Sequence, residues 1–129
     1  MNQSTHTILY IEDDTTARDI ICSLIRDRYG DLSVVDAWTA EEGLELYKTL
    51  HQPVVLTDIN LTNSSGVAMA RSIRAIDPGA VIIFVTGHSD AHLEEFTKSG
   101  PSHVLVKPID CLALFTLVDT YIRIPEFIS

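Results

Sequence analysis

Short apolar runs alternate with longer stretches of mixed apolar and polar residues along nearly the whole chain. Five of these runs are rich in Val, Ile and Leu, and they cover residues 7–11, 32–37, 53–57, 80–85 and 103–106. Runs of this length and composition are typical of strands that are buried in a sheet. The pattern therefore predicts five strands.

Between the runs, apolar residues recur three or four positions apart, which is the spacing of one face of a helix. The first helix is expected from about Ala17, with Asp14 or Thr15 as its cap. The second begins with a capping-box pattern, in which Thr39 binds the backbone of Glu42 and the Glu42 side chain reaches back. Further helices are expected after residue 66, after Ser89-Asp90 and after Asp110, so each strand is followed by a helix.

Each predicted helix has an apolar stripe that should face the core, and Arg18 is expected among the polar residues of the first helix. The stripes, in chain order, are Ile20, Ile21, Leu24 and Ile25; Gly43, Leu44, Tyr47 and Leu50; Val67, Ala70 and Ile73; Leu93 and Phe96; and Cys111, Leu114, Phe115, Val118 and Ile122. The polar stretch 59–66 shows neither the helical spacing of apolar residues nor the alternation of a strand, so it is expected to be a loop.

Strands that alternate with helices indicate parallel crossovers and a sheet that carries helices on both faces. The fold class is therefore α/β, with three layers. A chain of 129 residues with 46% hydrophobic residues is long enough for one core and short for two. We expect one domain over residues 1–129, with a core at about 7–122 and a C-terminal tail at 123–129.

Charge and composition narrow the classes of function. The formal net charge is −9 and the nine basic residues are scattered, which argues against direct nucleic-acid binding. The longest apolar run spans residues 80–85, far below the roughly 20 residues of a membrane helix. We expect a cytoplasmic protein without a membrane segment. Cys22 and Cys111 have no CxxC spacing and are expected to be reduced core thiols.

Chemically distinctive residues follow four of the five predicted strands. Glu12 and Asp13 follow the first strand, Asp58 ends the third, Thr86 follows the fourth and Lys107 follows the fifth. In a parallel sheet the carboxyl ends of the strands meet at one edge, where open α/β sheets bind their ligands. We therefore expect three carboxylates, a hydroxyl and an ammonium group in one crevice.

Three neighbouring carboxylates are costly unless a cation neutralises them, and their oxygen atoms suit Mg²⁺, or Mn²⁺ in its place. With that charge compensated, Asp58 can attack a phosphoryl group and form an acyl phosphate. Lys107 can draw charge away, and Thr86 can donate a hydrogen bond to a phosphoryl oxygen. Phosphoryl transfer needs mostly positioning and charge stabilisation, so this small set of groups is sufficient.

These residues, together with Gly66, Gly87 and Pro108, resemble the receiver domain of two-component response regulators over about residues 7–122. The resemblance implies a flavodoxin-like (βα)5 fold with strand order 2-1-3-4-5. It implies that Asp58 accepts a phosphoryl group from a phosphohistidine of a sensor histidine kinase or phosphotransfer protein, in a phosphorelay that switches a partner or output domain. The domain would then be no enzyme beyond its own phosphorylation and dephosphorylation.

The resemblance also implies roles for single residues. Asp13, Asp58 and the Asn60 backbone carbonyl would hold Mg²⁺, with Glu12 acting through water, and Lys107-Pro108 is similar to the cis-peptide position of the family. His88 lies where the family tunes hydrolysis of the acyl phosphate, as does Asn60. Two positions depart from the family pattern: Thr62 replaces a common Pro, and Val104 replaces the Tyr or Phe of the switch.

Other classes of protein and site compete with this one. A haloacid-dehalogenase-like phosphatase needs Asp-x-Asp after its first strand, and here Asn60 stands two residues after Asp58. A flavodoxin needs a phosphate-binding loop where this chain has acidic residues. A zinc pair at His88 and His92 lacks a third ligand nearby. The serious alternative is a receiver-like protein-interaction module that is not phosphorylated.

Overall fold

The structure is a computed structural model that describes residues 7–30, 32–61, 64–87, 96–98 and 100–122. The strands are β1 (Thr7–Ile11), β2 (Ser33–Ala37), β3 (Val54–Asp58), β4 (Asn60–Leu61), β5 (Ser64–Ser65), β6 (Val81–Thr86) and β7 (Ser102–Val106). The helices are α1 (Thr15–Arg28), α2 (Ala40–Leu50), α3 (Gly66–Ile76) and α5 (Cys111–Tyr121).

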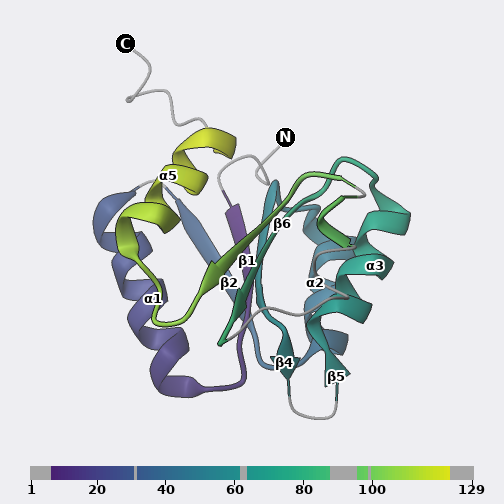
Figure 1. The fold of residues 1–129 in the computed structure, drawn as a ribbon, viewed down its shortest axis with the longest axis horizontal. Coiled ribbons are helices and arrows are strands. Elements are labelled where there is room, and N and C mark those ends of the chain that lie inside the picture. Colours follow the sequence, from purple (N-terminus) through teal and green to yellow (C-terminus); the bar gives the residue numbers. More distant parts are fainter. Residues whose placement is uncertain (1–6, 31, 62–63, 88–95, 99, 123–129) are drawn as a thin grey trace.

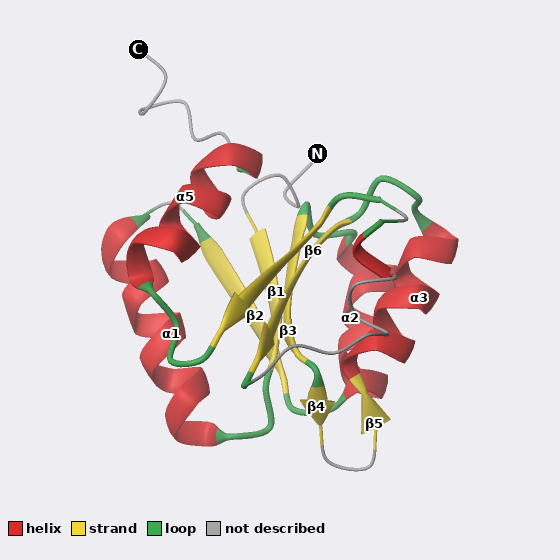
Figure 2. Ribbon diagram, viewed as in Figure 1, coloured by secondary structure: helices red, strands yellow, loops and turns green. Residues whose placement is uncertain are grey.

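Five strands form one parallel sheet in the order β2-β1-β3-β6-β7. Counted within this sheet alone, the order is 2-1-3-4-5. Helices α1 and α5 cover one face and α2 and α3 cover the other (Figures 1 and 2). The predicted three-layer, flavodoxin-like α/β fold is therefore confirmed.

The sheet divides the core into two apolar clusters, because successive side chains of a strand point to opposite faces. In β1, Ile8 and Tyr10 belong to the cluster under α1 and α5, whereas Leu9 and Ile11 belong to the cluster under α2 and α3. Strands β1, β3 and β6 are buried along their whole length. This burial explains why their sequences are continuous apolar runs rather than alternating ones.

The helix caps follow the sequence prediction with one difference. Asp14 caps α1 by accepting hydrogen bonds from the backbone N–H groups of Thr16 and Ala17, at 2.9 and 3.2 Å. Thr39 accepts from the Glu42 N–H at 3.0 Å, but the Glu42 carboxylate accepts from the Trp38 N–H at 3.0 Å instead of reaching back to Thr39. The pairing of β2 with β1 ends at Ala37, so the Trp38 N–H has left the ladder and takes the carboxylate as its partner.

The Asp110 cap of α5 is present as well, since its carboxylate accepts from the Leu112 N–H at 2.9 Å. Of the last helix's predicted stripe, Leu114, Val118 and Ile122 are buried, whereas Cys111 and Phe115 are only half-buried. Cys22 is a buried core thiol as expected.

Three other predictions were wrong. Ile20 is 55% exposed and Leu50 is 37% exposed, because each lies at the margin of its helical stripe beyond the reach of the sheet. Arg18 is buried rather than on the polar face, because it packs against the end of β2. The stretch after Asp58 is not wholly irregular, since β4 and β5 form a two-residue antiparallel ladder that is too short to show a period. The helix predicted after Ser89 lies largely outside the described residues.

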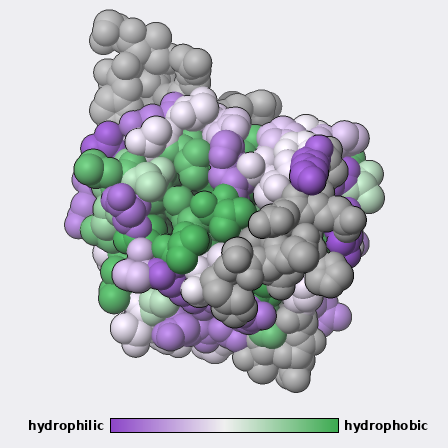
Figure 3. All heavy atoms as spheres, in the orientation of Figure 1, coloured by the Kyte–Doolittle hydropathy of each residue, from purple (hydrophilic) through white to green (hydrophobic). Residues whose placement is uncertain are grey.

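Apolar side chains gather on the surface over β7 and the start of α5 (Figure 3). The exposed members there are Val104, Val106 and Leu112. Strand β7 is an edge strand of the sheet, so only one of its sides is paired. Among the described helices, none combines the length and the apolar character that a membrane crossing requires.

Candidate functional site

Four strands deliver the candidate residues to one edge of the sheet. Glu12 extends the β1 ladder by one residue, since its N–H donates to the Ala37 carbonyl at 3.0 Å. Asp58 is the last residue of β3, and Thr86 is the last residue of β6. Lys107 follows β7 directly, and its N–H donates to the Thr86 carbonyl at 2.7 Å. The parallel topology thus places all four side by side.

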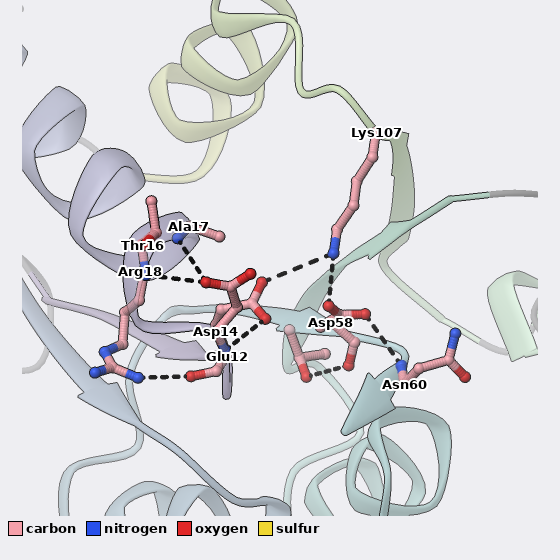
Figure 4. A network of polar contacts seen from close by, with 9 residues as sticks. Glu12, Asp14, Thr16, Ala17, Arg18, Asp58, Asn60 and Lys107 are labelled. Atoms are coloured by element: carbon pink, nitrogen blue, oxygen red, sulfur yellow. Dashed lines mark hydrogen bonds and ion pairs between the residues drawn. The ribbon is translucent and has the colours of Figure 1, made fainter. Parts of the chain in front are cut away.

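Asp58 is buried, and both of its carboxylate oxygens have partners (Figure 4). Its Oδ2 lies 2.7 Å from the Lys107 ammonium nitrogen, and its Oδ1 accepts the Asn60 N–H at 3.0 Å. Both contacts fix the orientation of the carboxylate. Asp58 is therefore a buried, oriented carboxylate beside a cation.

Glu12 is 1% exposed, and its two carboxylate oxygens differ in their surroundings. Oε2 accepts the Asp14 N–H at 3.2 Å, whereas Oε1 accepts no hydrogen bond within the described part of the chain and lies 3.9 Å from Lys107 Nζ. Burial raises the pKa of Glu12 to about 7; the Asp14 N–H opposes the rise, the Asp58 charge adds to it and the Lys107 charge opposes it. The Lys107 charge therefore compensates this carboxylate only in part.

Lys107 lies between the two acids and contacts both (Figure 4). Partial burial lowers the pKa of its ammonium group, but the hydrogen bond to Asp58 and the charges of Asp58 and Glu12 outweigh that effect, so the pKa is raised. The group therefore stays charged at neutral pH. The peptide bond that joins Lys107 to Pro108 is cis.

The remaining predicted residues occupy the same edge or lie outside the described part. Thr86 is buried at 2% exposure, and Asp13 is half-buried next to Glu12. Val104 is 38% exposed on β7, two residues before the end of the strand. His88 lies outside the described residues, as does Thr62. The structure thus brings Glu12, Asp58, Lys107 and the Asn60 backbone together.

Arg18 is a member of this neighbourhood that the sequence prediction missed. Its Nη1 donates to the Glu12 backbone carbonyl at 2.9 Å, and its Nε lies 2.9 Å from Asp36 Oδ2. Its guanidinium carbon also lies 4.6 Å from the centroid of the exposed Trp38 ring. Arg18 therefore ties the end of β1 to the end of β2. The sequence offered no signal for this, because an arginine inside an amphipathic helix is usually solvated.

Gly66 begins α3 beside the loop that leaves Asp58. Its N–H donates to the Ile59 carbonyl at 2.8 Å, and a Cβ atom at this position would collide with the Asp58 carbonyl oxygen. The loop therefore folds back against the Asp58 backbone at a distance that only glycine allows.

A divalent cation fits the donors at this edge in chemical terms. In the described ranges no three acidic, His or Cys side chains are already arranged as a metal site. Among the described residues the buried Glu12 Oε1 nevertheless finds no hydrogen-bond partner, and the partly exposed Lys107 ammonium contacts both acids. Carboxylate and carbonyl oxygens are the ligands that Mg²⁺ prefers, so Glu12, Asp13, Asp58 and the Asn60 carbonyl form a suitable set.

Comparison with known proteins agrees with this geometry. The family model described as "Response regulator receiver domain" matches residues 8–119. The transcriptional regulatory protein CitT of Bacillus subtilis is 31% identical over 103 residues, which cover 79% of this chain and 46% of that protein. A protein named cyclic di-GMP phosphodiesterase, from Thermotoga maritima, is 26% identical over 105 residues, 81% of this chain and 27% of that protein.

The fold has solved counterparts as well. The crystal structure of a response regulator receiver domain protein from Clostridium thermocellum superposes with a TM-score of 0.83 at 27% identity, covering 95% of this chain and 98% of that one. The chain spans between about a quarter and a half of the two curated relatives named above.

Proposed function

This chain belongs to the family of response regulator receiver domains, and from that premise we propose that Asp58 is its phospho-acceptor and that the neighbouring acids bind a divalent cation. The observation that carries this proposal is the 2.7 Å contact between the buried Asp58 Oδ2 and Lys107 Nζ, with Glu12 beside them. A carboxylate that is buried, oriented and next to a cation is equipped to act as a nucleophile.

The proposed transfer uses this chain's own groups in fixed roles. An oxygen of Asp58 attacks the phosphorus atom, the bond from phosphorus to the histidine nitrogen of the donor breaks, and the imidazole leaves. The product is an acyl phosphate on Asp58. Lys107 then pairs with a phosphoryl oxygen, and the Thr86 hydroxyl donates to another.

Asp13, Asp58 and the Asn60 carbonyl would hold Mg²⁺ or Mn²⁺, with Glu12 bound through water. The ion supplies positive charge that offsets the repulsion between the Asp58 carboxylate and the incoming phosphoryl group. We further propose that the Lys107-Pro108 peptide fixes the start of the following loop, and that His88 modulates hydrolysis of the acyl phosphate.

The switch is proposed to run through Thr86 rather than through an aromatic side chain on β7. Val104, at the position of the usual aromatic residue, has no ring that could turn inward. Its small side chain is 38% exposed. Closure of Thr86 on the phosphoryl group would therefore change the structure mainly at the end of β6.

The proposed partners are a sensor histidine kinase or phosphotransfer protein and an output domain or target protein. Two relatives are named as a transcriptional regulator and a phosphodiesterase, but this chain spans only part of each. We propose that this receiver itself catalyses nothing beyond its own phosphorylation and dephosphorylation. We also propose that it works in the cytoplasm and that residues 7–122 form the core of one domain. An unphosphorylated interaction module is not favoured, since every residue that the chemistry requires is present.

Labelling with a small phosphodonor tests the proposal. Acetyl phosphate with Mg²⁺ should add one phosphoryl group to the wild-type protein without a kinase, because the receiver supplies the stabilising groups. Intact-mass spectrometry should detect the adduct, and hydroxylamine should remove it, as expected for an acyl phosphate.

Two variants localise the label. Asp58→Asn keeps the shape of the side chain but is a poor nucleophile, so it should not be labelled. Asp19→Asn alters an exposed acid on α1 and should be labelled like the wild type. The unphosphorylated interaction module would be favoured instead if Asp58→Asn were labelled as strongly as the wild type. It would also be favoured if the wild type were not labelled at any Mg²⁺ concentration.

A further inference from the structure

Arg18 lies on the buried face of α1, where its neighbours are apolar. It is 4% exposed, and Ile21, Cys22 and Ile25 follow it at the helical spacing of that face. A buried charge is costly unless it is paired, and apolar residues of similar volume often stabilise a protein as well as a buried ion pair does. Stability alone therefore does not explain why this face carries an arginine.

Three groups at the ends of two strands fix the position of the Arg18 guanidinium. Its Nη1 donates to the Glu12 carbonyl at 2.9 Å (Figure 4), and its Nε lies 2.9 Å from Asp36 Oδ2. Its carbon lies 4.6 Å from the centroid of the Trp38 ring. Because a guanidinium is planar and its N–H groups point in fixed directions, the contacts with Asp36 and Trp38 together set where Nη1 points.

Arg18 meets Glu12 as a hydrogen-bond donor rather than as its counter-charge. The charge of Arg18 is paired with the carboxylate of Asp36, which belongs to β2. The charge that contacts the Glu12 carboxylate is that of Lys107, at 3.9 Å. The contact between Arg18 and Glu12 runs instead through the backbone carbonyl. Arg18 therefore acts on the position of the Glu12 backbone.

The Glu12 carbonyl belongs to the peptide unit that joins Glu12 to Asp13. That unit is planar, so a hydrogen bond to its carbonyl restricts the direction in which the backbone leaves β1. The N–H of Glu12 also donates to the Ala37 carbonyl of β2 at 3.0 Å. The Glu12 backbone is thus connected to β2 twice, once directly and once through Arg18, at the point where the two neighbouring acids begin.

We propose that Arg18 is a positioning residue of the phosphoryl-transfer site: it holds the peptide between Glu12 and Asp13 against β2 and so sets how these two acids face the cation. The inference rests on the proposed function, in which Asp13 binds Mg²⁺ directly and Glu12 binds it through water. Groups that orient the ligands of a metal change its affinity although they do not touch the metal.

Arg18→Met separates this role from a simple effect of charge. Methionine keeps much of the length and apolar volume of the side chain but has no N–H group. If Arg18 acted by its charge alone, its removal would lessen the repulsion of Mg²⁺, and the ion would bind more tightly. A positioning role predicts the reverse: the dissociation constant for Mg²⁺, measured by titration calorimetry, should rise by about tenfold.

Arg28→Met is the matched control, because Arg28 makes the same kinds of contact at the other end of α1. Its Nη2 lies 3.2 Å from Asp119 Oδ2, and its guanidinium carbon lies 4.8 Å from the centroid of the Phe115 ring. It lies about 15 Å along the helix from Arg18, so salt largely screens its charge from the crevice. The Mg²⁺ affinity of Arg28→Met should equal that of the wild type.

Arg18→Lys covers the case in which Arg18→Met does not fold. The variant keeps the positive charge, but one ammonium group cannot stack on Trp38 while it contacts both Asp36 and the Glu12 carbonyl. We expect its dissociation constant for Mg²⁺ to rise as well, although by less than in Arg18→Met. Wild-type affinity in Arg18→Lys would show that the charge alone matters and would overturn the inference.

Labelling by acetyl phosphate adds a readout that a loss of stability alone would not move. In both Arg18 variants the Mg²⁺ concentration for half-maximal labelling should rise by the same factor as the dissociation constant. The rate at saturating Mg²⁺ should stay at the wild-type value. Partial unfolding would instead lower the amount of labelled protein at every Mg²⁺ concentration.

The outcomes separate this inference from the proposed function. Equal or tighter Mg²⁺ binding in Arg18→Met, or an equal loss of affinity in Arg28→Met, would overturn the inference while the proposed function stands. A wild-type protein that binds no Mg²⁺ and is not labelled on Asp58 would overturn the proposed function itself, and the inference with it.

Discussion

Lys107 Nζ lies 2.7 Å from Asp58 Oδ2 but 3.9 Å from Glu12 Oε1, so one ammonium group serves two buried acids unequally. Asp58 receives a charge-assisted hydrogen bond, whereas Glu12 receives only the more distant charge. This inequality explains why the pKa of Glu12 is raised by its burial despite the neighbouring cation.

Removing the ammonium group should therefore destabilise the metal-free protein. In Lys107→Met the two acids face each other without compensation, and the free energy of unfolding should fall by about 1–2 kcal/mol, because the pair is partly exposed. Urea unfolding with and without Mg²⁺ measures this, and Mg²⁺ should stabilise the variant more than the wild type. Lys48→Met, which removes an exposed lysine on α2, serves as the control. An equal response of both variants to Mg²⁺ would contradict the prediction.

Glu12 should make the metal-free protein less stable as pH rises. Its pKa is raised from 4.5 to about 7 in the folded state, so between these values the folded protein keeps a proton that the unfolded chain has lost. Unfolding in this range then loses the proton, so the free energy of unfolding falls as pH rises. The fall is at most about 3 kcal/mol, and it ends when Glu12 is ionised in both the folded and the unfolded state. Unfolding curves for the wild type and Glu12→Gln over this range should diverge. Parallel curves would show that Glu12 does not titrate as described.

Gly66→Ala should disturb the backbone that carries Asp58. The added methyl group meets the Asp58 carbonyl oxygen, which cannot move without shifting the end of β3. We expect a loss of about 1–3 kcal/mol of stability and slower labelling of Asp58. Gly30→Ala is the matched control, because a Cβ there meets nothing within 4 Å. Thermal unfolding of both variants decides the matter: similar losses would mean that the close contact at Gly66 is unimportant.

Tyr29 should stabilise the protein without affecting the proposed phosphorylation of Asp58. Its hydroxyl donates to Asp119 Oδ1 at 2.6 Å and joins the end of α1 to α5, and burial with this bond raises its pKa to about 12. Tyr29→Phe should lower the free energy of unfolding by about 1–2 kcal/mol. Acetyl phosphate labelling should be unchanged. In a double-mutant cycle with Asp119→Ala the two losses should be less than additive, and strict additivity would refute the coupling.

Because Val104 has no aromatic ring, the structural response to phosphorylation should occur mainly around Thr86. With beryllofluoride and Mg²⁺, which imitate the phosphoryl group, the largest amide shift changes should fall at Thr86 and Gly87, with smaller ones along β7. Val104→Tyr should spread the changes into β7 and α5, because an aromatic side chain can then follow Thr86. Large shifts confined to Val104 and α5 in the wild type, with Thr86 silent, would argue against this route.

The sequence predicted well which residues lie together at the ends of the strands, because the topology of a parallel sheet alone decides which strand ends share an edge. Once strands and helices alternate, Glu12, Asp58, Thr86 and Lys107 must reach one edge, whatever the details of packing. The same reasoning could not place Arg18, because a helical period does not show whether a long side chain packs inward or points to solvent. Its burial depends on Asp36 and the Glu12 carbonyl, which are partners from other strands.

The β4–β5 ladder was missed because two residues per strand are too few to show alternation.

The contact between Arg18 and Trp38 has a practical consequence for experiments. Trp38 is the chain's only tryptophan, and its ring lies against the guanidinium group that also holds the Glu12 carbonyl. Because the indole is more than half exposed and stacks on Arg18, we expect its emission to respond to changes in that stacking. We expect its fluorescence to follow ion binding at Glu12 in real time, without a dye or an added label.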